Sequence, residues 1–401
     1  MTTTLIISPG NAVKKYALYQ HGACIAQWRF ARTVDRYEVC TLYQGAQQVC
    51  EKISFTSYTA SLRQVLDTAL REKHIALLQD ITVVAVQIVA PGTFFQKHSI
   101  IDTTYMQRLR SREATAPLYI PHTVRELEQL SQELPEATVI GVSDSAFHAA
   151  MPAVARTYGI AAEDTYQYDI HRFGYQGIAC ASVWRRVPTV LGHTPHRCII
   201  AHVGTALSMT AVQHGKSIDT TMGFSPASGL IMGSRAGSIE SGALLELMRV
   251  RNLSLFDAQS YVAVQSGLTG LVGEADFRHI LDRVASGDTE AKTALDIVTY
   301  HFQTQLGAYA VALGGLDTIV LTGAAMERSS DMRSRFLASL EWFGIKLDNT
   351  INDTLGRQGG VISLPNSSVQ VVVITSNEIA EMHHVAAGMI EPSTAVTTAS
   401  T

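Results

Sequence analysis

The segment Asp219–Glu240 carries the residues best suited to bind an anion. Its sequence is DTTMGFSPASGLIMGSRAGSIE, so a single arginine, Arg235, lies among four glycines and several hydroxyl side chains. Glycine lets a backbone approach a ligand closely, and exposed N–H groups and hydroxyls suit an oxyanion. The arginine can hold a carboxylate or a phosphate through two parallel hydrogen bonds. The segment is therefore a candidate anion-binding loop, although its composition is also typical of an ordinary turn-rich connection.

Two segments about half a chain apart share a pattern of strand, glycine turn and strand. The first contains Ile6, Gly10 and Tyr19, and the second contains Ile199 and Gly204. Both patterns are typical of a β-hairpin. The sequence contains neither G-x-x-x-x-G-K-[ST] nor G-x-G-x-x-G, so hairpin turns of this kind would have to hold any phosphate. The repeated pattern indicates an internal duplication.

Apolar periodicity predicts alternating helices and strands around these two turns. We expect helices over Ser61–Ala76, Thr123–Glu133, Ala149–Tyr158, Gly242–Val250, Ala291–Leu313 and Ile379–Ala387. We expect strands over Ile81–Val89, Thr138–Val142, Ile319–Thr322 and Val369–Thr375. Apolar strands that alternate with helices favour an α/β fold, and a chain of 401 residues favours two domains.

The composition argues against several classes of partner. The net charge is −4, so no basic field favours nucleic acid, and no apolar run reaches the ~18 residues that cross a bilayer. The five cysteines are odd in number and lack a C-x-x-C pair, so we expect reduced thiols in the cytoplasm. Charged residues make up only 16% of the chain, which suits self-association.

The order of residues from Asp219 to Arg235 resembles the segment D-T-[ST]-M-G-F-[ST]-P-x-x-G-L-x-M-G-[ST]-R of the acetate kinase family. Other blocks resemble this family in the same order over nearly the whole chain. They are SDSAFH (143–148), RFGYQG (172–177), HVGTALS (202–208), SGLTG (266–270) with DFR (276–278), LTGAAMERS (321–329) and TSNE (375–378).

The resemblance implies a two-lobed, actin-like (ribonuclease H-like) α/β fold with a central cleft. It implies an N-terminal lobe of residues 1–148, joined by a C-terminal helix over 379–401, and a nucleotide-binding and dimerisation lobe of residues 149–378. It also implies a homodimer that transfers a phosphoryl group reversibly between ATP and a short-chain carboxylate. The products would be an acyl phosphate and ADP, with Mg²⁺ as the metal.

The same resemblance implies the residues of the site. The catalytic positions would be Asp144, Arg235, Gln87 and Gln176, and the metal-side positions would be Glu378 and Ser8. The nucleotide would contact Gly204, Thr205, Asp276, Phe277, Arg278, Gly323 and Ala324. Each charged residue also has a structural alternative. Asp144 could cap a helix, Arg235 could pair with Asp219 or Glu240, and Glu378 could face a helix dipole.

Several departures from the family fall on the chemistry. The family has Asn at the position of Ser8, Arg at that of Gln87, and His at that of Gln176. Phosphoryl transfer needs charge neutralisation on the equatorial oxygens, and a glutamine brings no charge. A carboxylate kinase therefore remains the leading interpretation. The alternatives are a weakened relative that binds a nucleotide or acyl phosphate in a regulatory role, and a kinase with a changed acceptor or donor.

Three further departures concern binding. Met326 and Arg328 replace smaller residues of the family's adenosine loop, so we expect weaker nucleotide binding. Tyr175 stands where the family has a Phe against the acyl group, so we expect a more polar wall there.

Overall fold

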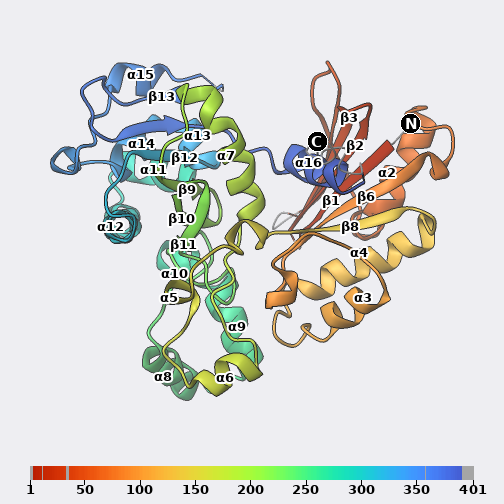
Figure 1. The fold of residues 1–401 in the computed structure, drawn as a ribbon, viewed down its shortest axis with the longest axis horizontal. Coiled ribbons are helices and arrows are strands. Elements are labelled where there is room, and N and C mark those ends of the chain that lie inside the picture. The colour runs from red at the N-terminus through yellow and green to blue at the C-terminus, as the bar shows by residue number, and fades with distance from the viewer. Residues whose placement is uncertain (1–2, 11, 33–35, 357, 391–401) are drawn as a thin grey trace, which may run out of the picture. The chain divides into compact units, whose positions relative to one another are not determined.

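The computed structural model describes residues 3–10, 12–32, 36–356 and 358–390, and it forms two compact units. The first unit comprises the chain up to Ala146 together with the part from Glu378 onward, and the second comprises Phe147–Asn377 (Figure 1). Asn11, which follows Gly10 in the sequence, is outside the described residues. Each unit contains one mixed β-sheet, which confirms the predicted α/β class.

The sheet of the first unit has the order β5-β4-β3-β2-β1-β6-β8-β7 among the described residues. Strands β1, β2 and β3 form an antiparallel meander, while β1, β6 and β8 run parallel. The strand bounds are β1 (Thr3–Pro9), β2 (Val13–Gln20), β3 (Ala23–Arg32), β4 (Tyr37–Tyr43), β5 (Val49–Ile53), β6 (Ile81–Ile88), β7 (Ser99–Ile100) and β8 (Thr138–Ser143).

The first four α-helices of this unit bury their apolar faces in one core with the sheet. The core includes Leu62 and Val65 of α2, Leu127 of α4, and Tyr16 and Phe30 of the meander. The helix bounds are α1 (Phe55–Thr59), α2 (Ser61–Arg71), α3 (Thr103–Arg110), α4 (Ile120–Glu133) and α16 (Glu378–Ile390).

The sheet of the second unit has the order β11-β10-β9-β12-β14-β13. Its strands β9, β10 and β11 are antiparallel, and β9, β12 and β14 are parallel, so the pairing repeats that of β1, β2, β3, β6 and β8. The strand bounds are β9 (Arg197–Val203), β10 (Leu207–Gln213), β11 (Lys216–Thr220), β12 (Thr318–Thr322), β13 (Gly360–Val361) and β14 (Gln370–Val373). The equivalent hairpins that follow β1 and β9 confirm the duplication inferred from the sequence.

The second unit carries most of the helices. Val183 and Val187 of α7 pack on Ile200 of β9 and Val320 of β12. The helix bounds are α5 (Ala153–Arg156), α6 (Ala162–Gln167), α7 (Gly177–Leu191), α8 (Ser241–Arg251), α9 (Leu255–Val264), α10 (Gly267–Val272), α11 (Phe277–Ala285), α12 (Thr289–Ala312), α13 (Ala324–Arg328), α14 (Ser330–Phe336) and α15 (Asn349–Thr354). In the described part of the chain, no helix is both long and apolar enough to span a bilayer.

Two predicted helices differ from the structure. The helix expected over Ala149–Tyr158 shrinks to the four residues of α5, because Pro152 precedes it and holds the chain extended there. The helix expected to reach Ala76 ends at Arg71, and Lys73 beyond it adopts a left-handed conformation with φ of 58°.

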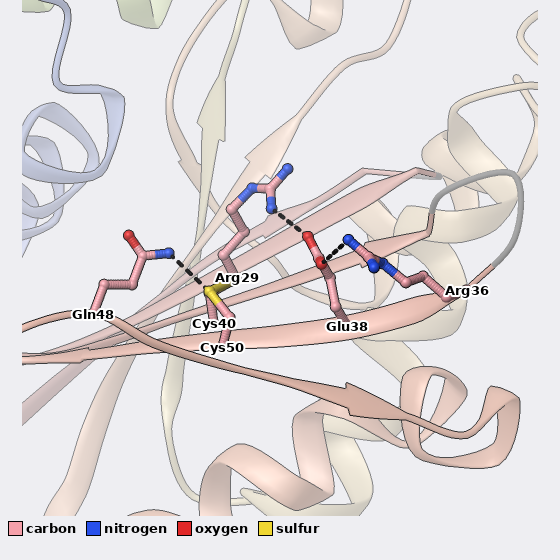
Figure 2. The surroundings of a disulfide bond; sticks show 6 residues. All are labelled: Arg29, Arg36, Glu38, Cys40, Gln48 and Cys50. Atoms are coloured by element: carbon pink, nitrogen blue, oxygen red, sulfur yellow. Dashed lines mark hydrogen bonds and ion pairs between the residues drawn. A yellow bond between two sulfur atoms is a disulfide. The ribbon is translucent and has the colours of Figure 1, made fainter.

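The expectation that all cysteines are reduced is wrong for one pair. Cys40 of β4 and Cys50 of β5 form a disulfide, while Cys24, Cys180 and Cys198 are free thiols. The two bonded residues are direct partners across the antiparallel pair, with Cα atoms 4.0 Å apart. Figure 2 shows the bridge beside the ion pair of Arg29 with Glu38. Cysteine spacing in the sequence did not reveal this disulfide, because the disulfide depends on which residues are opposed across the two strands.

Candidate active site

Three adjacent parallel strands of the first unit bring predicted catalytic and metal-side residues together. Ser8 lies near the end of β1, Gln87 near the end of β6, and Asp144 directly after β8. The Ser8 hydroxyl donates to Gln87 Oε1 over 2.6 Å, and Gln87 Nε2 lies 3.5 Å from Asp144 Oδ1. Carboxyl ends of parallel strands are the usual position of ligand sites in α/β folds. The three side chains therefore form one strand-end group.

The surroundings of β8 fix Asp144 in place. Its backbone N–H donates to the carbonyl of Ile88 over 2.9 Å, and its residue exposure is only 5%. The preceding residue, Ser143, donates its backbone N–H to Nδ1 of His98 over 3.1 Å. Burial lowers the pKa of the His98 imidazole, against the opposing effect of Glu381, so the neutral ring can accept this bond. Two hydrogen bonds thus anchor the backbone that carries Asp144.

Glu378 lies in the first turn of α16 and approaches the same hairpin. Its Oε2 is 3.6 Å from the Lys15 ammonium, and Lys15 is the direct β2 partner of Ser8. Directly opposed residues of an antiparallel pair project on the same face of the sheet. The two metal-side residues, Ser8 and Glu378, are therefore both neighbours of Lys15.

In the second unit, Gln176 occupies a strained turn at the start of α7. It adopts a left-handed conformation with φ of 59° and its Oε1 accepts a hydrogen bond from Ser208 over 2.5 Å. The backbone before it passes very close to His148, since a Cβ on Gly174 would lie 2.6 Å from that ring. Only glycine therefore fits at position 174.

Tyr175 does not make the expected polar wall. The ring is 1% exposed, and its hydroxyl donates to the carbonyl of Phe224 over 2.7 Å. A hydroxyl that already has this buried acceptor adds little polarity to a neighbouring surface.

Arg235 lies within the predicted anion-binding loop. Its Nη1 donates to the carbonyl of Pro226 over 3.0 Å. Of the two suggested carboxylate partners, Asp219 pairs with Arg172 at 3.1 Å, and Glu240 caps α8. The structural alternative of an ion pair between Arg235 and Asp219 or Glu240 stays a prediction.

Asp219 occupies the other end of the same loop. Burial raises the pKa of its carboxyl, and the guanidinium of Arg172 opposes that rise. Tyr309 also lies 3.5 Å from Oδ1. Asp219 therefore contacts Arg172 and Tyr309 of its own unit. These contacts position the loop that carries Arg235.

The predicted nucleotide residues meet around two glycines. A Cβ on Gly323, whose φ is +88°, would lie 2.6 Å from the carbonyl oxygen of Val203, so this turn lies against the end of β9. A Cβ on Gly233 would lie 3.1 Å from the Thr205 oxygen and 2.9 Å from that of Ala275. The Gly204–Thr205 turn, Gly323 and the start of the Asp276 segment therefore lie close together.

The Asp276–Arg278 segment has mixed roles. Asp276 caps α11 and forms an ion pair with the exposed Arg278 at 2.5 Å. The Phe277 side chain is 4% exposed and meets Phe336 edge-on, so it serves the core. Met326 is also fully buried.

Three residues beside the predicted site were missed from the sequence. They are Lys15, Ser208 and Glu327, which contact Glu378, Gln176 and the Gly323 turn respectively. Glu327 Oε1 accepts from the backbone N–H of Gly323 over 2.8 Å and of Ser376 over 3.2 Å. Hairpin register could have identified Lys15 opposite Ser8. Ser208 and Glu327 depend on tertiary packing that spacing does not report.

The donors around Lys15 suit a hard cation only in part. The described residues contain no cluster of three or more His, Cys, Asp or Glu side chains. Mg²⁺ commonly uses one or two carboxylates with substrate phosphates and water, and Glu378 with the Ser8 hydroxyl would fit that pattern.

Two sheets share one strand order over β3-β2-β1-β6-β8 of the first unit and β11-β10-β9-β12-β14 of the second, which is the duplicated α/β fold of the actin-like kinases. The acetate kinase of Porphyromonas gingivalis has this fold, with a TM-score of 0.85 and 26% identity over 98% of this chain and 100% of its own. A propionate kinase of Francisella tularensis gives a TM-score of 0.87 and 27% identity, over 95% and 98% of the two chains.

Sequence comparison identifies the family. The model of the acetokinase family matches residues 3–383. An acetate kinase of Bacteroides thetaiotaomicron is 33% identical over 383 residues, which cover 93% of this chain and 96% of its own. One of Coprothermobacter proteolyticus is 35% identical over 387 residues, covering 93% and 95%. The chain belongs to the acetokinase family and is a phosphotransferase that acts on a carboxylate.

Proposed function

We propose that this protein transfers a phosphoryl group reversibly between ATP and a short-chain carboxylate, giving an acyl phosphate and ADP. The observation that carries the proposal is the strand-end group of Ser8, Gln87 and Asp144, with Glu378 beside the same hairpin. These residues come from four separate segments, yet three of them end adjacent parallel strands, as a site in this fold requires.

Each predicted residue takes one role in this proposal. Arg235 would hold the carboxylate or the transferred phosphoryl group through its guanidinium. In the Gly204–Thr205 and Gly323–Ala324 turns, the backbone N–H groups of Thr205 and Ala324 would face the nucleotide phosphates, and Asp276 and Arg278 would contact the nucleoside. Asp144 would orient the reacting groups.

Mg²⁺ would be held by Glu378 and Ser8 together with nucleotide phosphates. The bound ion would neutralise the charge that develops on the phosphoryl oxygens. Lys15, 3.6 Å from the Glu378 carboxylate, would keep that side chain in position before the ion binds.

We further propose that acetate turnover is weak. The side-chain amide of Gln87 bonds with Ser8 and Asp144, and that of Gln176 accepts a hydrogen bond from Ser208. Because both side chains are neutral amides, neither supplies a positive charge to the reacting phosphoryl group. Loss of one cationic contact in phosphoryl transfer costs roughly 10³–10⁵ in rate. These contacts also favour a second candidate function, a protein that binds a nucleotide or acyl phosphate in a regulatory role with little turnover. A kinase with a different acceptor or phosphoryl donor is the remaining alternative.

The assay is acyl-phosphate trapping with hydroxylamine, run with acetate and propionate, beside calorimetric titration of ATP with Mg²⁺. The double variant Gln87→Arg and Gln176→His should raise the acetate rate by at least an order of magnitude. The matched control adds the same groups on exposed helix positions, Gln107→Arg and Gln132→His, and should leave the rate unchanged.

Three outcomes decide between the candidates. Wild-type turnover of acetate at the rate of an ordinary acetate kinase would refute the proposed weakness. Retained nucleotide binding with no acyl phosphate and no rescue would favour the regulatory role. No binding of ATP, ADP or pyrophosphate would remove both the kinase and the nucleotide-binding candidates.

We also propose a homodimer formed through the second unit. Four large apolar side chains of α8 and α9 are more than half exposed: Leu245 (65%), Val250 (58%), Leu255 (70%) and Phe256 (57%). Exposed apolar groups of this size favour association with another surface. Light scattering should give a dimer mass, and Leu255→Ser with Phe256→Ser should give a monomer. A cytoplasmic location is part of the same proposal, and fractionation of the source cells tests it.

A further inference from the structure

A separate cavity of about 380 Å³ lies in the first unit, and Gly10 and Lys14 of the β1–β2 hairpin are among the residues that line it. Its lining comes from the β1–β2 hairpin, the β3–β4 pair, α1 and α4. The volume is at the lower end of the range for small-molecule sites, which is about 300–1,000 Å³. None of the residues assigned above to the carboxylate, the metal or the nucleotide lines this cavity.

One wall of the cavity is aromatic. The ring of Tyr37 lies 5.6 Å from that of Phe55 and 5.1 Å from that of Tyr58. Phe55 is 61% exposed although it is large and apolar. A planar ligand that stacked on this wall would remove that ring from water and gain the offset contacts that aromatic pairs favour.

Two guanidinium groups line the same cavity. They belong to Arg32 at the end of β3 and Arg125 on α4, and neither meets a carboxylate among the described residues. Arg125 Nη2 lies 2.7 Å from His122 Nδ1. Burial, then the charges of Arg125 and Lys14, lower the pKa of His122, so the neutral ring accepts this bond and holds the guanidinium.

The remaining charges of the cavity cancel each other. The Lys14 ammonium forms an ion pair with Glu126 at 3.1 Å, and the Glu126 side chain is only 2% exposed. Tyr16 donates to the same carboxylate over 2.5 Å, and Ser61 accepts from Lys14 over 3.0 Å. This closed network leaves a net charge of about +2, from Arg32 and Arg125, for a ligand.

We propose that this cavity binds a small anion that carries an aromatic ring, of the class of a nucleoside monophosphate. The phosphate would lie between Arg32 and Arg125, because guanidinium groups bind phosphate through paired hydrogen bonds. The base would stack on the wall of Tyr37, Phe55 and Tyr58, since stacking on aromatic side chains is open to every base. The site is distinct from the nucleotide turns of the second unit.

Gly10 connects this cavity to the strand-end group. It lines the cavity, and its backbone N–H donates to the carbonyl of Ser8 over 3.1 Å. The turn leaves no room for adjustment, because a Cβ on Gly10 would lie 2.3 Å from the carbonyl oxygen of Val13. A ligand in the cavity would therefore contact the turn that positions Ser8.

Calorimetric titration of the full chain with AMP tests this proposal, in the presence of saturating ADP and Mg²⁺ to occupy any nucleotide turns. We expect one AMP per chain. Adenosine and inorganic phosphate should each bind at least tenfold more weakly, since each lacks one half of the ligand. Added AMP should slow amide hydrogen exchange in β3, β4, α1 and α4.

Variants of exposed residues locate the site. Arg32→Gln with Arg125→Gln should weaken AMP at least tenfold, and Phe55→Ala should weaken AMP and adenosine together. Arg71→Gln with Arg249→Gln removes two exposed guanidinium groups elsewhere and should leave AMP binding unchanged. A circular dichroism melt checks that every variant is folded.

Several results would overturn the proposal. They are no AMP binding to the wild type at millimolar concentration, full displacement of AMP by ADP, and equal affinity in the Arg32 and Arg125 double variant. A failure of ADP itself to bind would count against the nucleotide turns proposed for the second unit, and it would leave the cavity proposal intact.

Discussion

We predict that the buried imidazole of His148 makes the free energy of unfolding depend on pH. Its ring is fully buried, with Nδ1 2.9 Å from the Ser217 hydroxyl and Nε2 3.0 Å from the Tyr175 carbonyl. Burial lowers the pKa of this imidazole to about 4, against a smaller opposing effect of the Tyr175 carbonyl. In the unfolded chain the same group titrates near 6.5, as histidine usually does.

The sign of the effect follows from proton binding. Between pH 6.5 and about pH 4 the unfolded chain holds a proton on His148 that the folded chain does not. The free energy of unfolding therefore falls as the pH falls through this window. One pKa unit corresponds to about 1.4 kcal/mol, so the loss is about 2 kcal/mol at pH 5 and about 3.4 kcal/mol below pH 4.

The experiment compares the wild type with His148→Gln in urea unfolding from pH 8 to pH 5. Hydrogen exchange of β9 and β10 reports the second unit separately. Glutamine can keep a donor and an acceptor but does not titrate, so the stability advantage of the wild type should shrink by about 2 kcal/mol over this range. Ser217→Ala removes a partner but keeps the imidazole, and it should retain the wild-type dependence. Parallel curves for the wild type and His148→Gln would refute the reasoning.

Three further predictions concern other parts of the chain. Arg235→Gln should lower acyl-phosphate formation by roughly 10²-fold or more with little change in melting temperature, and an unchanged rate in the hydroxylamine assay would exclude an anion-binding role. Gly323→Ala, whose Cβ would lie 2.6 Å from a carbonyl oxygen, should cost about 1–3 kcal/mol, whereas Gly388→Ala, with open space around it, should not destabilise; calorimetric melting compares them. Alkylation of the denatured, unreduced protein should label three of the five cysteines, and Cys50→Ser should label four; five labelled thiols in the wild type would contradict the disulfide.

The sequence predicted most of the elements because their apolar patterns are long. The strand expected over Ile81–Val89 is β6, and the long helix expected over Ala291–Leu313 is α12, each within two residues. Failures occurred where local chemistry overrides the pattern, as at Pro152 before α5 and at Lys73 after α2.

The motifs predicted which residues belong to the site, but they did not predict the contacts between those residues. Motifs identified Gln87 and Asp144, but not the bonds that join them to Ser8, because neighbouring strand ends are set by sheet order. The Phe277 side chain belongs to the core, which a motif does not distinguish from a contact with ligand. Cys50 illustrates the same limit, since cysteine spacing does not report which residues are opposed across strands.

The two sheets differ at one edge. The first continues past its meander into β4 and β5, and the second has no equivalent strands in the described part of the chain. Strands at such an edge can be gained, altered or lost without disturbing the pairings that both halves share. Tyr37 of the aromatic wall lies on β4, so the cavity depends on this appended ribbon. We expect the ribbon to vary more among relatives than the strands that both halves retain.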